Sequence, residues 1–299
     1  MRVVITGANS YIGNSLEAYT QSIDKGFEIC QLDVIGEAWR TFDFSGYDAV
    51  VHVAAIVHRK DSVSWEEYQA INTDLTAEIA EKAKNQGVRQ FVFLSSMAVY
   101  GVEKALSPQK SIVTADTPLN PTSMYGKSKL LAEERLAELE SEDFKVAVVR
   151  PPNVYGPGCR GGYISTYKSI VSKLPFIPKA YTSVKQSVLF IDNLSRFIYL
   201  LITQKKRGVY TPQDDTGVSA VEIMEYIGEA LELRKKANTF FGFFVPLLSF
   251  SSLVRKGYGG ISYDPSISHQ DEFDYVIVSV KEGIQRTVLY GNKHHHSGV

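Results

Sequence analysis

The chain contains 299 residues, of which 44% are hydrophobic and 22% are charged, and its formal net charge is −1. This composition is typical of a folded globular protein and excludes disordered and fibrous classes, while the near-neutral charge argues against a nucleic-acid partner. Two cysteines are too few for a disulfide framework, so we expect a protein of the reducing cytoplasm.

Strands and helices are predicted to alternate along the first half of the chain. Residues 3–6 form a β-branched run closed by a glycine, which is typical of a buried parallel strand and its turn. Further strands are predicted at 27–34, 49–54, 91–95 and 146–150, and helices at 11–21, 65–86 and 125–140. Successive β–α units of this kind require a parallel sheet with helices on both faces. We therefore predict an α/β fold with a doubly wound parallel sheet, the Rossmann fold.

The second half of the chain has a different pattern. Glycine and proline cluster after residue 150, which predicts a loop at the mouth of the sheet. One more sheet strand is expected at 187–192, followed by a helix through residue 202 and a later helix near 221–231. We assign 1–154 with 186–204 to the Rossmann domain, 155–185 with 205–290 to a smaller, discontinuous C-terminal substrate domain, and 291–299 to a tail that holds no metal.

The longest apolar run covers residues 240–250 and contains Gly242 and Pro246. It is well short of the ~20 residues that a membrane-spanning helix needs, so no membrane span is expected. We expect this run to be buried in the second domain rather than to touch a membrane surface.

The turn after the first predicted strand has the features of a dinucleotide cradle. A pyrophosphate needs backbone N–H groups at a helix N-terminus, and glycine lets the chain approach it closely. Gly7 and Gly13 stand where the strand becomes the helix, and Ser10 replaces the central glycine of the usual pattern. The sequence therefore predicts a bound dinucleotide at this turn.

An acidic residue follows at the distance expected for a ribose contact. Asp33 lies twenty residues after Gly13, at the end of the second predicted strand. Its carboxylate favours NAD, because it would repel the 2′-phosphate of NADP, although Arg40 nearby keeps NADP as the less favoured alternative. Asp43 and Phe44 are expected to border the adenine.

One Tyr-x-x-x-Lys pair has the right context for proton transfer. The pattern occurs three times, and chance alone predicts about one match, so the spacing by itself carries little information. Tyr125 and Lys129 open a long predicted helix, where positions four apart share a face. The Lys129 ammonium, together with a positive nicotinamide, would stabilise a Tyr125 phenolate able to accept a hydroxyl proton. Ser96, at the end of the strand that contains FVFLSS, is expected to hold the substrate oxygen.

Six motifs follow one another along the chain: TGANSYIG (6–13), HVAA (52–55), FVFLSSMAVYG (91–101), YGKSK (125–129), RPPNVYGPG (150–158) and VLFIDNLS (188–195). In this order they resemble the extended short-chain dehydrogenases/reductases, and within them the NAD-dependent nucleotide-sugar epimerase/dehydratase family, with likeness to UDP-glucose and UDP-GlcNAc 4-epimerases. The resemblance covers about residues 1 to 200 well and the remainder loosely.

The resemblance implies a set of site residues. The catalytic residues it implies are Ser96, Tyr125 and Lys129. With the residues argued above, the predicted NAD contacts are Gly7, Asn9, Ser10, Tyr11, Ile12, Gly13, Asp33, Asp43, Phe44, Val53, Ala54, Ala55, Ser95, Tyr125, Lys129 and Pro152. The predicted contacts to the sugar nucleotide are Ser96, Met97, Ala98, Tyr125, Asn153, Gln186 and Arg255. Gln186 stands where many relatives have an arginine, and Arg255 is expected to supply the missing charge.

The reaction within the family stays open between two choices. Members that dehydrate the sugar usually carry an Asp-Glu pair where this chain has Met97 and Ala98, so elimination of water is not expected. We favour 4-epimerisation through a 4-keto intermediate, in the synthesis of surface-polysaccharide precursors, over one-way 4-ketoreduction. A third alternative is a non-catalytic dinucleotide-binding regulator. The resemblance also implies a homodimer that pairs through the helices at 65–86 and 125–140.

Overall fold

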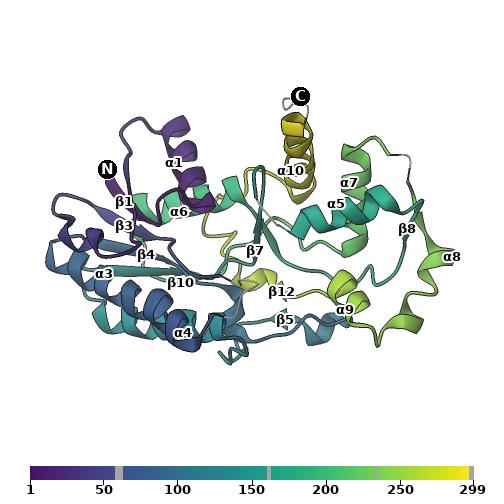
Figure 1. The fold of residues 1–299 in the computed structure, drawn as a ribbon, viewed down its shortest axis with the longest axis horizontal. Coiled ribbons are helices and arrows are strands. Elements are labelled where there is room, and N and C mark those ends of the chain that lie inside the picture. The colour runs from purple at the N-terminus through teal and green to yellow at the C-terminus, as the bar shows by residue number, and fades with distance from the viewer. Residues whose placement is uncertain (58–62, 160–162, 234, 296–299) are drawn as a thin grey trace.

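A six-stranded parallel sheet forms the centre of the larger part of the molecule (Figure 1). The computed structural model describes residues 1–57, 63–159, 163–233 and 235–295. The strands lie in the order β10-β6-β4-β3-β1-β2. Their bounds are β1 Arg2–Thr6, β2 Glu28–Leu32, β3 Ala49–His52, β4 Gln90–Leu94, β6 Lys145–Val149 and β10 Gly208–Tyr210.

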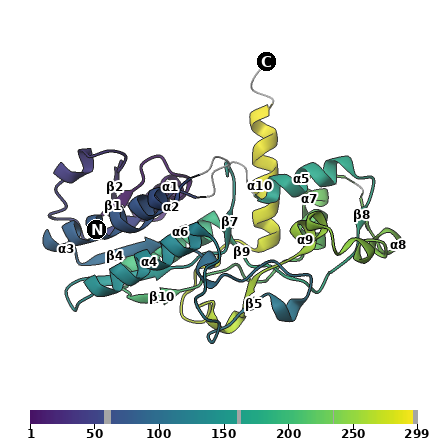
Figure 2. The ribbon, with the colours of Figure 1, turned by 60° about the horizontal axis from the view of Figure 1, so that its bottom comes forward.

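Helices cover both faces of this sheet, as Figures 1 and 2 show. Val3 and Ile5 of β1 belong to one core cluster and Val4 to the other, because successive side chains of a strand point to opposite faces. The first face carries α1 (Tyr11–Ile23) and α6 (Ile191–Thr203). The second carries α3 (Leu75–Asn85) and α4 (Met124–Leu139). The predicted doubly wound Rossmann fold is confirmed.

The last strand of the sheet differs from the prediction. Residues 187–192 were expected to add a sheet strand, but β9 (Val188–Phe190) pairs in parallel with β7 (Asn153–Tyr155) in a separate two-stranded sheet. The sixth strand of the central sheet is β10, which lies inside the 205–290 segment assigned to the substrate domain. The buried apolar run at 188–190 looks like a sheet strand in sequence, and its pattern does not specify the pairing partner.

The second part of the molecule is built from small sheets and short helices (Figure 1). Two further strand pairs are parallel: β8 (Ile177–Pro178) with β11 (Ala237–Asn238), and β5 (Ile112–Val113) with β12 (Ser262–Tyr263). The helices are α5 Tyr163–Lys173, α7 Ala220–Ala230, α8 Thr239–Gly242, α9 Ser252–Tyr258 and α10 Val280–His295. Shorter turns are α2 Trp65–Tyr68, η1 Ala38–Thr41, η2 Gln69–Asp74, η3 Met97–Tyr100, η4 Pro108–Lys110, η5 Pro246–Leu248 and η6 Pro265–Ile267.

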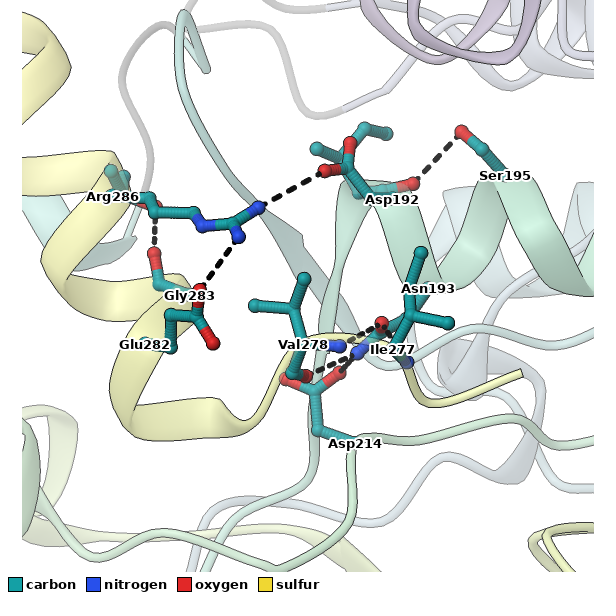
Figure 3. A network of polar contacts seen from close by, with 11 residues as sticks. Asp192, Asn193, Ser195, Asp214, Ile277, Val278, Glu282, Gly283 and Arg286 are labelled. Carbon is teal, nitrogen blue, oxygen red and sulfur yellow. Dashed lines mark hydrogen bonds and ion pairs between the residues drawn. The ribbon is translucent and has the colours of Figure 1, made fainter. Parts of the chain in front are cut away.

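Buried polar groups fasten the start of α6 to the C-terminal segment (Figure 3). Asn193 donates from Nδ2 to Asp214 Oδ1 at 2.8 Å, and its Oδ1 accepts from the backbone N–H groups of Ile277 and Val278 at 2.9 and 3.0 Å. Arg286 of α10 lies 3.7 Å from the Asp192 carboxylate. These contacts join α6 to Asp214, to residues 277–278 and to α10, which are distant from it in sequence.

Two expectations for the C-terminal part are wrong. The 240–250 run was expected to be buried, yet Phe240, Phe243 and Phe250 are 68%, 72% and 78% exposed. The run breaks into α8 and η5 around Gly242 and Pro246, so it forms no continuous helix with one face to bury. The tail expected from residue 291 begins inside α10, which continues to His295. Within the described ranges, the helices are too short or too polar to cross a membrane.

Candidate active site

The turn from β1 to α1 has the predicted cradle geometry. Ser10 is the N-cap of α1, and its Oγ accepts from the Gly13 N–H at 3.1 Å. Gly7 has a φ of +98°, and a Cβ there would lie 3.0 Å from the backbone nitrogen of Ala54. A side chain at position 7 would therefore be strained and would push the strand β1 away from the loop after β3. The turn presents backbone N–H groups at a helix N-terminus, as an anionic pyrophosphate requires.

A groove with a volume of about 660 Å³ runs along the carboxyl ends of β1, β2 and β3. Six of the predicted NAD residues line it: Gly7, Ser10, Asp33, Val53, Ala54 and Ala55. Arg40, considered in the sequence for a 2′-phosphate, lines it as well. Sequence reasoning missed the rest of the wall, which consists of Ala8, Val34, Ile35, Gly36, Glu37, Trp39, Ile56, Ala70, Ile71, Asp74, Leu75 and Glu78. Three predicted contacts, Asn9, Tyr11 and Gly13, stand in the turn or in α1 rather than in this wall.

The charges of the groove suit NAD better than NADP. Asp33, Glu37, Asp74 and Glu78 all line it. Arg40, the one group considered for a 2′-phosphate, forms ion pairs with Glu37 and with Glu78, the latter at 2.7 Å. Because its charge is balanced by two carboxylates, a further phosphate dianion would meet net negative charge. The residues present therefore fit a cofactor whose ribose carries free hydroxyls.

Asp43 and Phe44, which were predicted to border the adenine, do not line the groove. Phe44 is fully buried in the core under α3, and the Asp43 carboxylate accepts from the Ser45 backbone N–H at 2.9 Å. The short helix η1 turns the chain away from the groove before residue 43. Trp39, from that helix, lines the groove instead.

A second cavity, of about 500 Å³, joins the groove through the shared residues Val53 and Ala55. It brings together the three predicted catalytic residues, Ser96, Tyr125 and Lys129. The predicted residues Ile12, Ser95, Met97, Ala98, Pro152, Asn153 and Gln186 also line it. Residues that sequence reasoning did not single out complete the wall: Val57, Leu94, Gly101, Val102, Lys104, Thr122, Ser123, Pro151, Val154 and Ile261.

Lys129 is held at the floor of this cavity. Its side chain is 1% exposed, and Nζ donates to the Leu94 carbonyl oxygen at 2.7 Å and lies 4.5 Å from the centre of the Phe93 ring. Burial lowers the pKa of Lys129 to about 7, against the opposing effect of the Glu133 carboxylate. A lysine with this pKa can hold or release a proton near neutrality.

Tyr125 stands one helical turn before Lys129 on α4, whose N-cap is Ser123. Burial raises the pKa of Tyr125 to about 12, although its hydrogen bond with Ser96 acts in the opposite direction. The residues around Tyr125 therefore keep the phenol protonated on their own. Formation of a phenolate requires an additional positive charge in the cavity. The sequence-based prediction assigned this charge to the nicotinamide, and the side chains around Tyr125 do not supply it.

A buried ion pair between Glu133 and Arg150 holds α4 against the end of the sheet. Glu133, one turn after Lys129, accepts from Arg150 Nε at 3.1 Å and from the Ser95 hydroxyl. Arg150 also donates to the Tyr100 hydroxyl at 3.0 Å. Ser95 was predicted to contact NAD, but its hydroxyl is directed to Glu133. The only sequence signal for Glu133 is its i, i+8 relation to Tyr125 on one helix face.

A buried asparagine fixes the loop that separates the two cavities. Asn72 accepts from the Ile56 N–H at 2.8 Å and donates to the Ile56 carbonyl oxygen at 3.0 Å. The same amide donates to Ser128 of α4 at 3.0 Å. Asn72 lies in η2, a π-helical turn, and such turns frequently occur at functional sites. Sequence reasoning treated this region as regular helix and had no signal for the turn.

Gln186 provides an unpaired acceptor in the wall of the catalytic cavity. The residue is 2% exposed, and its backbone N–H donates to the Val218 carbonyl oxygen at 3.0 Å. Its side-chain Oε1 is buried and has no hydrogen-bond partner among the described residues. A buried acceptor without a partner is destabilising, so this position is suited to a donor group of a ligand.

Arg255 does not line the catalytic cavity, contrary to the expectation. It lines a third cavity of about 490 Å³, next to Lys104, Lys110 and Ser249. The two cavities share Val102 and Lys104, so they are neighbours along the 101–106 segment. The placement of Arg255 depends on α9, which the sequence pattern did not predict.

Comparison with known proteins agrees with this geometry. A sequence model described as the NAD dependent epimerase/dehydratase family matches residues 3–211. The chain belongs to this family. Among its relatives, UDP-glucose 4-epimerase of Vibrio cholerae is 28% identical over 254 residues, which cover 77% of this chain and 76% of the relative. N-acetyl-alpha-D-glucosaminyl-diphospho-ditrans,octacis-undecaprenol 4-epimerase of Escherichia coli O157:H7 is 27% identical over 249 residues, covering 78% and 73%.

Solved structures of the same fold extend over nearly the whole of this family member. MoeE5, solved in complex with UDP-glucose and NAD, superposes with a TM-score of 0.73 at 21% identity and covers 99% of this chain and 100% of its own. The UDP-glucuronic acid 4-epimerase from Bacillus cereus, solved in complex with NAD, gives a TM-score of 0.73 at 18% identity, with 98% and 99% covered. At these identities the likeness establishes the fold.

Proposed function

We propose that this family member is an NAD-dependent epimerase that inverts C4 of a hexose or N-acetylhexosamine carried on UDP. The observation that carries the proposal is the junction of the two cavities, where Ser96, Tyr125 and Lys129 meet the groove with the acidic wall. NAD, when bound, supplies a hydride acceptor and returns the hydride later. Gly7, Ser10, Asp33 and the 53–55 loop would hold it.

The side chains would move the proton. Ser96 hydrogen bonds with Tyr125 and would orient the sugar 4-hydroxyl toward the phenol oxygen. As C4 loses its hydride and becomes a ketone, the 4-hydroxyl proton passes to the Tyr125 oxygen, and the reverse transfer restores a hydroxyl of opposite configuration. Lys129, with its pKa of about 7, would favour the phenolate when protonated. Turning the keto sugar over before reduction changes the product from the original sugar to its epimer.

Several observations favour this reaction over related ones. Met97 and Ala98 line the catalytic cavity and carry no ionisable group, so the wall offers no acid and base for elimination of water at those positions. The relatives named above are 4-epimerases of sugars on a nucleotide or on a diphospho-undecaprenol. The role we propose for this chain is the supply of surface-polysaccharide precursors.

Location and assembly are part of the same proposal. We propose a cytoplasmic location, because the two cysteines, Cys30 and Cys159, are free thiols and the cytoplasm keeps thiols reduced. We propose a homodimer in which the α3 and α4 helices of two copies pack together, because the resemblance implies pairing through this region. A monomeric mass in light scattering would contradict the dimer.

The first experiment identifies the nucleotide released from the purified protein by denaturation, followed by incubation with UDP-glucose or UDP-GlcNAc without added reductant. Bound NAD and conversion to the galacto epimer are expected. Tyr125→Phe should retain NAD and lose roughly 10²- to 10⁴-fold in turnover. Tyr19→Phe, on α1 outside both cavities, should behave as the wild type. Oxidation of added NADH or NADPH with a 4-keto sugar would replace the proposal by ketoreduction, and NAD binding without either activity would favour a regulator.

A further inference from the structure

An exposed apolar surface lies at the far end of the second part of the molecule. Phenylalanine and leucine side chains that are at least 40% exposed gather there from α8, η5 and the start of α9: Phe240, Phe241, Phe243, Phe244, Leu247, Leu248, Phe250 and Leu253. Both ribbon views place α8 at the end of the molecule opposite the central sheet (Figures 1 and 2). Exposed apolar groups of this size and number usually mark a binding surface.

The surface is a built part of the fold. Phe241 stacks on Phe176, with ring centroids 3.7 Å apart, and the Asn238 side chain caps α8. A Cβ at Gly242 would lie 2.0 Å from the Lys179 carbonyl oxygen, so α8 lies directly against the 178–180 segment. At the other end, Val254 of α9 is buried. These anchors leave the remaining aromatic rings directed outward.

Basic residues outnumber acidic ones around the surface, where Glu103 is an acidic residue in the cavity beside Ser249 and Arg255. Residues 233–263 contain five basic residues and no acidic residue. Lys236 precedes the apolar segment, Arg255 and Lys256 follow it, and all three are exposed. Lys179, on the neighbouring segment, is exposed as well. Exposed aromatic rings with a basic border are the features by which proteins bind the interface of an anionic bilayer.

The surface continues toward the active site. The cavity of about 490 Å³ is lined by Ser249, which lies in the apolar run 240–250, and by Arg255, which follows it. Lys104 lines both this cavity and the catalytic one. A membrane bound at the apolar surface would therefore lie beside a cavity whose charged residues are Lys104, Lys110, Arg255 and Glu103, and which adjoins the catalytic cavity.

We infer that residues 239–253 form a membrane-docking surface that binds the interface of an anionic lipid bilayer. The aromatic and leucine side chains insert among the acyl chains near the headgroups, and Lys236, Arg255 and Lys256 contact the lipid phosphates. The association is peripheral, since the apolar segment is interrupted at Gly242 and Pro246. The inference stands on this surface alone and does not depend on the proposed epimerase activity.

A second copy of the chain is the alternative occupant. A twofold pairing through this surface would bring the basic borders of both copies together without a carboxylate from the 233–263 stretch to balance them. Phosphate headgroups balance the same charges directly, which is why we favour the bilayer.

The test is co-sedimentation of the full chain with vesicles of phosphatidylcholine alone or mixed with phosphatidylglycerol. The wild type should bind the mixed vesicles, and added salt should weaken the binding. Phe240→Ser/Phe243→Ser/Phe250→Ser should lower binding by at least roughly tenfold. The matched control Ile23→Ser/Ile277→Ser/Leu289→Ser removes three exposed apolar groups elsewhere and should leave binding unchanged.

A second set of variants, with altered charges, distinguishes contact with lipid headgroups from non-specific hydrophobic adsorption. Lys236→Glu/Lys256→Glu should reduce binding to the anionic vesicles more than Lys25→Glu/Lys205→Glu does. Tyr125→Phe should bind vesicles as the wild type does, which keeps this result independent of catalysis. Absence of wild-type binding, or equal binding by the triple phenylalanine variant, would overturn the inference. So would a wild-type dimer that this variant converts into a monomer without any vesicle binding, because a second copy would then be the occupant.

Discussion

Lys129 donates a hydrogen bond from Nζ to the carbonyl oxygen of Leu94 at 2.7 Å, which joins the helix α4 to the end of β4. This contact fixes the ammonium close to the strand end from which Ser96 follows. The same burial that positions the group also disfavours its charge. The position of Lys129 therefore has a cost in stability, as is common for ionisable groups buried in a functional site.

Replacement of Lys129 by methionine should change how stability depends on pH. The pKa of Lys129 is about 7 in the folded protein and 10.5 ordinarily, so the unfolded chain binds more protons between these values. Wild-type stability should therefore rise relative to Lys129→Met as pH increases from 7 to 10. We expect a relative gain of roughly 2–5 kcal/mol in the free energy of unfolding.

Urea unfolding at pH 7 and at pH 9.5 measures this gain. Lys127→Met, at the exposed neighbouring position on α4, should show no such trend. A constant difference between wild type and Lys129→Met over this range would mean that Lys129 does not titrate as described.

Asp33 and Asp43 form a matched pair for the cofactor groove. Asp33 lines the groove, whereas Asp43 does not. Asp33→Asn retains the acceptor for the Ile35 N–H, which Oδ1 contacts at 2.9 Å, so the turn should remain folded. Loss of a charged acceptor for the ribose hydroxyls should weaken NAD binding by roughly tenfold and narrow the preference for NAD over NADP.

Fluorescence or calorimetric titration with both nucleotides gives the two affinities. Asp43→Asn should stay within about twofold of the wild type. If the two variants lost NAD affinity equally, the groove assignment would be wrong.

The fold was largely predictable where hydrophobic pattern and chain order agree. AVVH and FVFL are short apolar runs between helical segments, and such runs have few alternatives in an α/β protein. Residues 188–190 carry an equally strong pattern but pair with β7, while the weaker GVY of β10 completes the central sheet. The choice between these partners depends on long-range contacts such as those of Asn193, which no local pattern contains.

The candidate site was predictable where a local motif sets the geometry. Gly7, Ser10, Tyr125 and Lys129 follow from a turn and a helix face, and the structure places them as expected. The positions of Phe44 and Arg255 depend on η1 and α9, short turns without a sequence signature. The exposed phenylalanines near Phe240 were misjudged, because hydrophobicity alone does not distinguish a buried segment from a binding surface.

Gln186 should contribute to substrate binding at a cost in stability. Its Oε1 is buried, has no partner within the described part of the chain and lines the catalytic cavity. Gln186→Leu removes the unpaired acceptor, so the folded protein should be as stable as the wild type or more stable. If a substrate hydroxyl or amide donates to this oxygen, KM should rise roughly 5- to 10-fold with kcat changed much less.

Steady-state kinetics and thermal unfolding of one preparation supply both values. Gln204→Leu, at an exposed position after α6, serves as the control and should change neither. A stability loss without any change in KM would assign Gln186 to packing alone.

Asp214 gives a final prediction, because it is a buried carboxylate that the proposed chemistry does not use. It accepts from the Phe190 N–H at 2.9 Å, from Asn193 Nδ2 at 2.8 Å and from the Tyr155 hydroxyl at 2.8 Å. Burial nevertheless raises its pKa from 3.8 to about 7, and these hydrogen bonds only partly oppose the shift. Between those values the folded protein binds more protons than the unfolded chain, so this group makes stability fall as pH rises.

Asp214→Asn should remove that dependence. The amide oxygen can still accept from Phe190 and Asn193, and the Tyr155 hydroxyl can donate to the Val280 carbonyl oxygen, 3.3 Å away, while accepting from the new amide. Relative to the wild type, the variant should gain roughly 2–4 kcal/mol in unfolding free energy between pH 4 and pH 7.5. Asp271→Asn, at an exposed position, should show no comparable gain. Chemical unfolding across this range gives the free energy of unfolding of both proteins at each pH. If the free energies of Asp214→Asn and the wild type changed in parallel with pH, the carboxylate would be ionised throughout, and its three hydrogen-bond donors would outweigh the effect of burial.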